Sequence, residues 1–393
     1  MYQNVFLEIK RYGYFPITLA CFTALSCSVF NHADSTIGDN TFHIGFIIVK
    51  LFFLCLSFFF FLNRNEKRSS NWIYYLMPFL ISEMVMGSFS FIGILGIALF
   101  AFANDKEKYN CFCFFRSILV ITSLLGIIGY IAYIVKLPIP YTTTPLYNSV
   151  DGYYINYGFT ILTFDYTSLR LDGFFNEPGY FGTILALTLI ADNLNYRRKS
   201  NIVMLLGGIF TLSLAFFIII GMFLLINNIG RFTRLIGLLV SILLLFLLLS
   251  KTGLFSDAAI EKTLDRFVLE DGRLVGDNRS SGNLDNAYDK VINDQNLWVS
   301  GYGERGHFAV ESTLSGKSLI VLYGIGGTLF MLGSLFFCVV KTNRMSWYKW
   351  CFIICFFSSI YQRPSVFNLH YFLILFGGLV YIDQMEKNKV YET

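Results

Sequence analysis

Charged side chains cluster where a polar, tyrosine-rich segment meets a long apolar run. Arg170 and Asp172 precede the dipeptide Glu177-Pro178, and proline is favoured in the first turn of a helix, where its missing N–H costs nothing. Charges at a membrane boundary are expensive and are usually kept for a purpose. The stretch therefore indicates either a functional site or a capped helix with interfacial anchors.

A second group of polar residues lies in a later segment. Three cations, Arg279, Arg305 and His307, are followed by the carboxylate Glu311 just before an apolar run. Guanidinium forks suit the oxygens of phosphates and pyrophosphates. Together with Arg170, these arginines could lie close together at one level of the membrane boundary. The alternative is a solvated loop whose arginines pair with its own aspartates.

The sequence lacks the motifs of two functional classes, metal-dependent nucleotide-sugar transferases and ATP-driven transporters. The chain contains no Asp-x-Asp sequence, so metal-dependent nucleotide-sugar chemistry has no obvious site. It also contains no G-x-x-x-x-G-K-[ST] sequence, which excludes ATP-driven transport by this chain alone. We therefore expect no metal ion and no other cofactor.

The composition indicates that these residues are positioned by membrane-spanning helices. Of 393 residues, 55% are hydrophobic and only 14% are charged, and the mean hydropathy is +0.58. The apolar residues come in runs rather than alternations, which predicts an all-α polytopic membrane protein that forms one integral membrane domain over 1–393. The net charge of +4 says little, because in such proteins the placement of charge matters more than its sum.

A helix needs about 20 apolar residues to cross the hydrocarbon core. On this basis we predict twelve helices, near 13–31, 42–62, 72–86, 88–103, 114–135, 178–194, 201–213, 215–229, 235–250, 318–340, 347–361 and 366–383. The segments 72–103 and 201–229 each carry basic clusters on both flanks, so the positive-inside rule predicts a hairpin of two short helices in each. Twelve spans place both termini in the cytoplasm.

Two long polar loops are predicted on the outer side. The first, 136–177, is rich in tyrosine, which is typical either of an interfacial belt or of a sugar-stacking surface. The second, 251–317, has 67 residues with 11 acidic and 8 basic side chains, and helical character at 257–267 and 284–293. Loops of this length are usually functional.

The order of these motifs resembles the Wzy-type O-antigen and polysaccharide polymerases and the related O-antigen ligases. The resemblance covers about 165–370, roughly half of the chain. Five features carry it: Arg170 before Phe175-Asn176-Glu177-Pro178; Thr211-Leu212-Ser213 at a hairpin tip; Arg279 before an Ala287…Ile292 helix and Gly301-Tyr302-Gly303; Glu311 before Tyr323-Gly324-Ile325-Gly326; and Tyr361-Gln362-Arg363-Pro364 at the last outer turn. One departure is Leu214, where many relatives have a basic residue.

The resemblance implies an arrangement like that of C-type glycosyltransferases in the bacterial inner membrane. Such a polymerase moves a growing glycan from undecaprenyl diphosphate onto a hydroxyl of the next lipid-linked repeat, on the periplasmic face. The expected partners are these lipid-linked glycans, membrane lipids and a chain-length regulator, with no nucleic acid. Arg170, Arg279, Arg305 and Arg363 are the expected diphosphate-binding residues, because cations can stabilise the leaving group in place of a metal.

The acceptor hydroxyl needs a base, and Glu311 or His307 is expected to supply it. Glu177 is the expected supporting residue, which orients one of the arginines. His370, near a helix end, is interpreted as structural.

Two alternatives stay open. An O-antigen ligase usually has a His-Asn pair before the helix that follows the large loop, whereas Phe308 follows His307 here. The second alternative is a flippase or permease. Such transporters usually have short, even loops and internal repeats, and this chain has unequal loops and no visible repeat.

Overall fold

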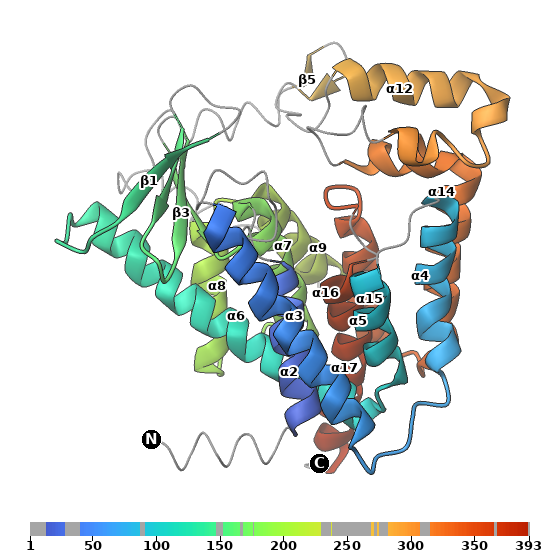
Figure 1. Cartoon of the computed structure of the whole chain (residues 1–393), viewed down its shortest axis with the longest axis horizontal. Helices are drawn as coiled ribbons and strands as arrows, with labels where there is room; N and C mark the ends of the chain where they lie inside the picture. Colours follow the sequence, from blue (N-terminus) through green and yellow to red (C-terminus); the bar gives the residue numbers. More distant parts are fainter. Residues whose placement is uncertain are drawn as a thin grey trace.

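A computed structural model describes residues 13–27, 40–86, 91–146, 152–165, 168–175, 177–228, 237, 269–270, 273–274, 282–306, 315–364 and 368–391. Within these ranges the protein is mostly helical (Figure 1). Three of the described helices are long and apolar enough to cross a membrane: α3 (Asn40–Leu62), α6 (Asp105–Ile134) and α14 (Gly316–Thr342).

The shorter described helices coincide with the other predicted segments. They are α2 (Tyr14–Ser26), α4 (Trp72–Met86), α5 (Phe91–Phe102), α7 (Pro178–Ala191), α8 (Lys199–Phe210), α9 (Leu214–Asn227) and α15 (Trp347–Ser359), followed by the continuous run of α16 (Leu369–Phe372), a π-helical turn (Leu373–Gly377) and α17 (Gly378–Tyr391). The predicted helix at 235–250 lies outside the described residues except for Gly237.

Helix α6 begins earlier than the predicted start at 114. Asn104 caps it, because the Asn104 side chain accepts from the Glu107 N–H and the Glu107 carboxylate accepts from the Asn104 N–H, both at 2.9 Å. This reciprocal pair satisfies two N–H groups that an uncapped helix start leaves open. The polar first turns are therefore part of the helix.

The prediction of an all-α fold is wrong in the first outer loop. There β1 (Thr142–Pro145), β2 (Tyr153–Asn156), β3 (Ile161–Asp165) and β4 (Ser168–Gly173) form an antiparallel sheet in sequence order. The reason is the alternation of the side chains. In β4, Leu169 and Leu171 are buried while Ser168 and Arg170 are partly exposed, and this period of two is that of a strand.

The sheet lies against α6, and two glycines of that helix permit the close approach. A Cβ atom at Gly126 would lie 2.4 Å from a Leu171 methyl group, and one at Gly129 would lie 2.5 Å from the Thr160 methyl group. Both distances are below any ordinary carbon–carbon contact. The sheet therefore packs on the last turns of α6, at the same end of the molecule as α12 (Gly282–Asn293) (Figure 1).

The described part of the second outer loop is tied to α14. Helix α12 confirms the helical character predicted at 284–293, whereas 257–267 lies outside the described residues. After α12, the Tyr302 N–H donates to the Val321 carbonyl at 2.9 Å, and the Gly326 N–H donates to the Trp298 carbonyl at 2.7 Å. These bonds form where α14 is broken at Gly324, whose φ is 71°.

Candidate functional site

The structure brings three of the predicted site residues to the end of the helices that carries the sheet and α12, which we call the outer end (Figure 1). Glu177 is the N-cap of α7, Arg363 lies in the turn after α15, and Arg170 lies on β4. Arg305 belongs to the 3₁₀ turn Gly303–Gly306, of which only the backbone is described. The remaining three predicted residues, Arg279, His307 and Glu311, lie outside the described residues.

Arg363 and Glu177 form an ion pair at the start of α7. The Arg363 Nη2 atom lies 2.5 Å from the Glu177 Oε2 atom. The guanidinium is buried, with 5% of its side chain exposed, whereas 49% of the Glu177 side chain is exposed. The pair therefore presents a carboxylate to the outside and keeps its cation behind it.

Tyr180 and His370 extend this pair into the protein. The Tyr180 hydroxyl shares a hydrogen bond with His370 Nε2, and the Arg363 guanidinium carbon lies 5.9 Å from the centre of the Tyr180 ring. Tyr180 is partly exposed, whereas His370 is buried. We call Glu177, Tyr180, Arg363 and His370 the outer cluster.

Sequence reasoning did not select Tyr180. A signal was present, because Tyr180 follows Glu177 by three residues in a helix that starts at Pro178, and residues three apart share a helix face.

Arg170 joins the sheet to the tip of the α8–α9 hairpin. Its Nε atom donates to the Thr211 carbonyl at 3.2 Å. The tip is bent sharply, since Leu212 has a φ of 48°, a left-handed conformation that is costly for a non-glycine residue. It also abuts α7, because a Cβ atom at Gly182 would lie 2.8 Å from the Thr211 hydroxyl. Arg170, the hairpin tip and the start of α7 thus meet at one place.

Asp172 follows Arg170 by two residues on β4 and is fully buried. The Thr163 hydroxyl donates to its Oδ2 atom, while its Oδ1 atom has no hydrogen-bond partner among the described residues. Burial raises the pKa of Asp172 to about 8, against the opposing effects of Thr163 and of the Arg170 charge. A carboxyl that is neutral near physiological pH therefore supports the strand that carries Arg170.

The segment that contains His307 and Glu311 rejoins the described chain beside Arg363. The Gly316 N–H donates to the Tyr361 carbonyl at 2.7 Å, two residues before Arg363. On the other side of that segment, a Cβ atom at Gly306 would lie 3.0 Å from a Leu322 methyl group of α14. Both ends of the segment are thus fixed at the outer end of α14.

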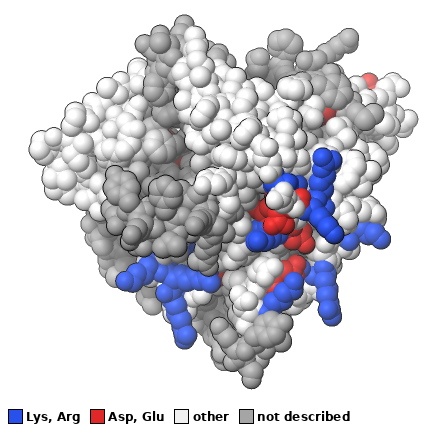
Figure 2. All heavy atoms as spheres, turned by 60° about the horizontal axis from the view of Figure 1, so that its bottom comes forward, with Lys and Arg blue, Asp and Glu red and all other residues white. Residues whose placement is uncertain are grey.

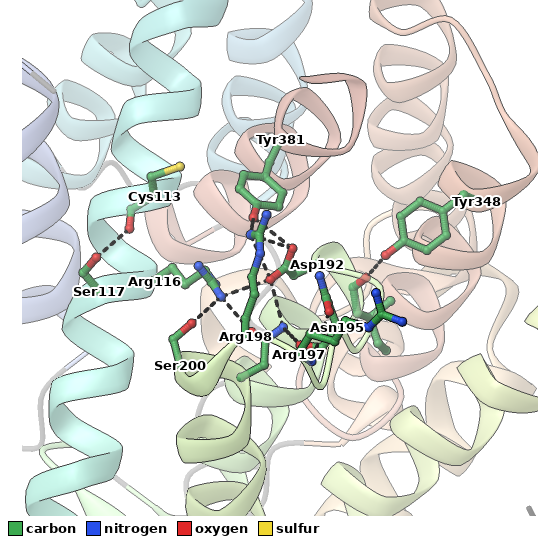
Figure 3. Close-up of polar contacts among 12 residues, drawn as sticks. Cys113, Arg116, Ser117, Asp192, Asn195, Arg197, Arg198, Ser200, Tyr348 and Tyr381 are labelled. Atoms are coloured by element: carbon green, nitrogen blue, oxygen red, sulfur yellow. Dashed lines mark hydrogen bonds and ion pairs between the residues drawn. The ribbon is translucent and has the colours of Figure 1, made fainter. Parts of the chain in front are cut away.

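A different cluster occupies the other end of α7 (Figure 3). Asp192, the C-cap of α7, is fully buried. Its carboxylate lies 3.0 Å from Arg116 of α6 and 3.0 Å from Arg198. It also accepts from Asn201 of α8 at 2.8 Å and from Tyr381 of α17 at 2.9 Å. We call these five residues the inner cluster.

The inner cluster lies at the end of the molecule where basic side chains gather. Figure 2 shows Lys and Arg on the face opposite to the sheet and α12. Among the described residues, Arg64 pairs with Glu107, and Lys349 pairs with Asp383 at 2.5 Å. The orientation of the helices that the positive-inside rule gives stays a prediction.

No family model, curated protein or solved structure matches the chain. The chemistry of the outer end must therefore be judged from its own residues. It combines a buried arginine, a partly exposed carboxylate, a tyrosine hydroxyl and a second arginine on the neighbouring sheet. Such a set can bind anionic oxygens and hydroxyl groups.

Proposed function

We propose that the protein is a polysaccharide polymerase that joins undecaprenyl-diphosphate-linked repeat units on the periplasmic face of the bacterial inner membrane. The observation that carries the proposal is the placement of two arginines at the outer end of the helices: Arg363 pairs with Glu177 at the N-cap of α7, and Arg170 bonds to the α8–α9 tip that abuts α7. Arginines at a membrane boundary are expensive to place there, and guanidinium groups are suited to a diphosphate leaving group.

The proposed reaction transfers the growing glycan from its lipid carrier to a sugar hydroxyl. A new bond forms between the acceptor oxygen and the anomeric carbon, and the bond from that carbon to the diphosphate oxygen breaks. The lipid diphosphate leaves with the electron pair, and Arg170, Arg279 and Arg305 stabilise its charge, with Arg363 as a further contributor. Glu311 or His307 accepts the proton of the acceptor hydroxyl, and Glu177 orients Arg363.

The proposal includes the finer arrangement of the chain in the membrane. Twelve spans, several of them short, place both termini in the cytoplasm and both long loops in the periplasm. The three helices of spanning length and the basic face of Figure 2 support this orientation. Such a protein would resemble C-type glycosyltransferases in its general layout, with a sheet added to the first loop.

The decisive test is a gel of surface glycans from the source strain with and without this gene. We expect the ladder to collapse to core plus a single repeat in the deletion strain and to return with the wild-type gene. Arg279→Glu should fail to restore the ladder while it accumulates normally in the membrane; full restoration by this variant would refute its role.

Two other results would replace the proposal. Polymer that persists on its lipid carrier in the deletion strain would identify a ligase. A ladder unchanged by the deletion would point to transport.

A further inference from the structure

The segment that joins α12 to α14 exposes two apolar side chains next to each other. Within the described residues, Trp298 is 42% exposed and Val299 is 73% exposed. The Trp298 indole is oriented by the end of α12, because its Nε1–H donates to the Ile292 carbonyl at 2.9 Å. The one polar group of the indole is thus bonded within the protein, and its remaining contacts are those of an apolar ring.

The backbone of this pair is fixed on α14. The Gly326 N–H donates to the Trp298 carbonyl at 2.7 Å, and the Gly327 N–H donates to the Val299 carbonyl at 2.9 Å. The contact is close, because a Cβ atom at Gly326 would lie 3.4 Å from the Val299 Cα atom. Trp298 and Val299 therefore lie level with the turn of α14 that holds these two glycines.

Gly326 is also the first residue of an exposed apolar stripe on α14. The exposed residues of this stripe recur at intervals of three or four along the helix: Gly326, Leu329, Phe330, Gly333, Phe336, Phe337 and Val340. This spacing places them on one side of the helix. Trp298 and Val299 extend that side at its outer end, so a continuous apolar surface runs from α14 into the loop. Large apolar surfaces of this kind mark a contact with another molecule or with a membrane.

The other end of the stripe indicates the depth of the pair. Lys341 and Arg344 follow the stripe and are exposed, as expected where a helix leaves the hydrocarbon core. Trp347 comes next and is also exposed, and tryptophan is enriched at both boundaries of a membrane. From Gly326 to Lys341 the helix rises by about 22 Å, since each residue adds about 1.5 Å. This rise is less than the roughly 30 Å of a hydrocarbon core, so a pair bonded at Gly326 lies at the outer boundary of the core or just within it.

We propose that Trp298 and Val299 are inserted into the membrane leaflet at the outer end of the helices, where they contact lipid acyl chains near the headgroups. The second outer loop is thereby attached to the bilayer surface, with α12 lying across the end of α14 (Figure 1). The inference rests on α14 crossing the membrane and is independent of the proposed reaction.

The first test measures quenching of Trp298 fluorescence in the full-length protein in nanodiscs. The emission of Trp298 is the difference between the wild type and Trp298→Phe, recorded in phosphatidylcholine and in the same lipid with bromine atoms near the top of one acyl chain. Brominated lipid should remove at least about half of this emission, and aqueous iodide should change it little, because the indole lies in the boundary region. Trp347→Phe is the matched variant for the exposed tryptophan at the other boundary, and its difference emission should respond in the same way.

Val299 gives a second readout that leaves the tryptophans intact. A nitroxide attached to Val299→Cys should collide more often with oxygen than with a water-soluble nickel chelate, because oxygen partitions into apolar surroundings. Gln295→Cys, at an exposed position of the same loop, is the matched control and should show the opposite preference. The wild-type chain labelled in the same way corrects for the native cysteines, of which Cys55 is exposed. If Trp298→Phe does not fold, this pair of variants carries the test.

The two readouts together decide the proposal. Quenching by brominated lipid and a preference for oxygen at Val299→Cys would support it. Quenching by iodide, with a nitroxide at Val299→Cys that behaves like the one at Gln295→Cys, would place the pair in water and overturn it. Protection from both quenchers and from both collision partners would show that another protein, such as a second copy of this chain, covers the surface, which would also overturn it. The polymerase proposal is tested separately by the glycan ladder.

Discussion

Helix α7 has a carboxylate at each end, Glu177 at its N-cap and Asp192 at its C-cap, and arginine pairs with both. The helix dipole has opposite effects on the two carboxylates. It favours a negative charge at the N-terminus and opposes one at the C-terminus. Asp192 therefore needs its two arginines, whereas Glu177 is in a favourable field before Arg363 is added.

The two clusters also differ in access. The Asp192 side chain is 0% exposed and the Glu177 side chain is 49% exposed. Each cluster leaves one arginine Nε atom without a described partner, at Arg116 and at Arg363, so an unpaired donor alone does not distinguish them. What distinguishes the outer cluster is the exposure of its Glu177 side chain. The inner cluster holds helices together, whereas the outer one also presents a carboxylate at the surface.

The largest expected effect comes from removing the inner carboxylate. Asp192→Ala leaves Arg116 and Arg198 without their shared partner and should cost about 3–5 kcal/mol of stability. The matched change Glu177→Ala also leaves a buried guanidinium, that of Arg363, without its partner, but it should cost less, about 1–3 kcal/mol, because the Glu177 side chain is 49% exposed and water can take its place. Thermal unfolding of both variants in detergent measures the difference. Equal losses of stability would mean that the two ends of α7 are held in the same way.

The helices could be predicted from the sequence because the signals are local. Apolar runs and basic flanks fixed eleven of the twelve helix positions to within a few residues at most ends, and Pro178 marked the start of α7. The sheet carried a signal too, but the tyrosines of the first loop were interpreted as a belt or a stacking surface rather than as strand residues.

The clusters could not be predicted, because their contacts join distant parts of the chain. Asp192 meets Arg116 across 76 residues and Tyr381 across 189, and Tyr180 meets His370 across 190. A single sequence has no period or motif that pairs such positions. Arg170 and Glu177 were selected for their charge at a boundary, whereas Asp192 fell inside the predicted helix 178–194 and was not singled out.

A smaller loss of stability is expected from a substitution at Gly324, where α14 is broken and the second long loop is bonded to it. Gly324 has a φ of 71°, and a Cβ atom there would lie 2.6 Å from the carbonyl oxygens of Leu297 and Trp298. Gly324→Ala should therefore lower stability by about 2–4 kcal/mol, because its φ of 71° and ψ of 173° lie in a region essentially restricted to glycine and the new methyl group would overlap backbone atoms, and it should loosen the segment that carries Tyr302. The control is Gly333→Ala in the same helix, where nothing lies within 4 Å.

Limited proteolysis checks where the Gly324→Ala change acts. We expect faster cleavage after α12 in this variant than in Gly333→Ala, with no change in cleavage near the inner cluster. Cleavage rates that match between the two variants would show that the outer loop is held by other contacts.

A pH dependence is also expected at the outer end. Burial raises the pKa of Asp172 to about 8, above the value of about 3.9 for an exposed aspartate. The folded protein therefore keeps a proton that the unfolded chain has released. The stability that this proton provides is fully present below about pH 4 and is lost as the pH rises to about 8. Melting temperatures in detergent should fall between about pH 6 and pH 8.5.

Asp172→Asn isolates the source of this dependence. The amide stays neutral at every pH, so the variant should melt at nearly the same temperature at about pH 6 and at about pH 8.5. The difference between its melting temperature and that of the wild type should therefore shift in favour of the variant as the pH rises. Asp192→Asn is the companion variant at the inner end, and it should keep the wild-type pH dependence although it melts at a lower temperature. A wild-type melting temperature that rises with pH would contradict the assignment, because it would require a carboxylate that folding favours in its charged form.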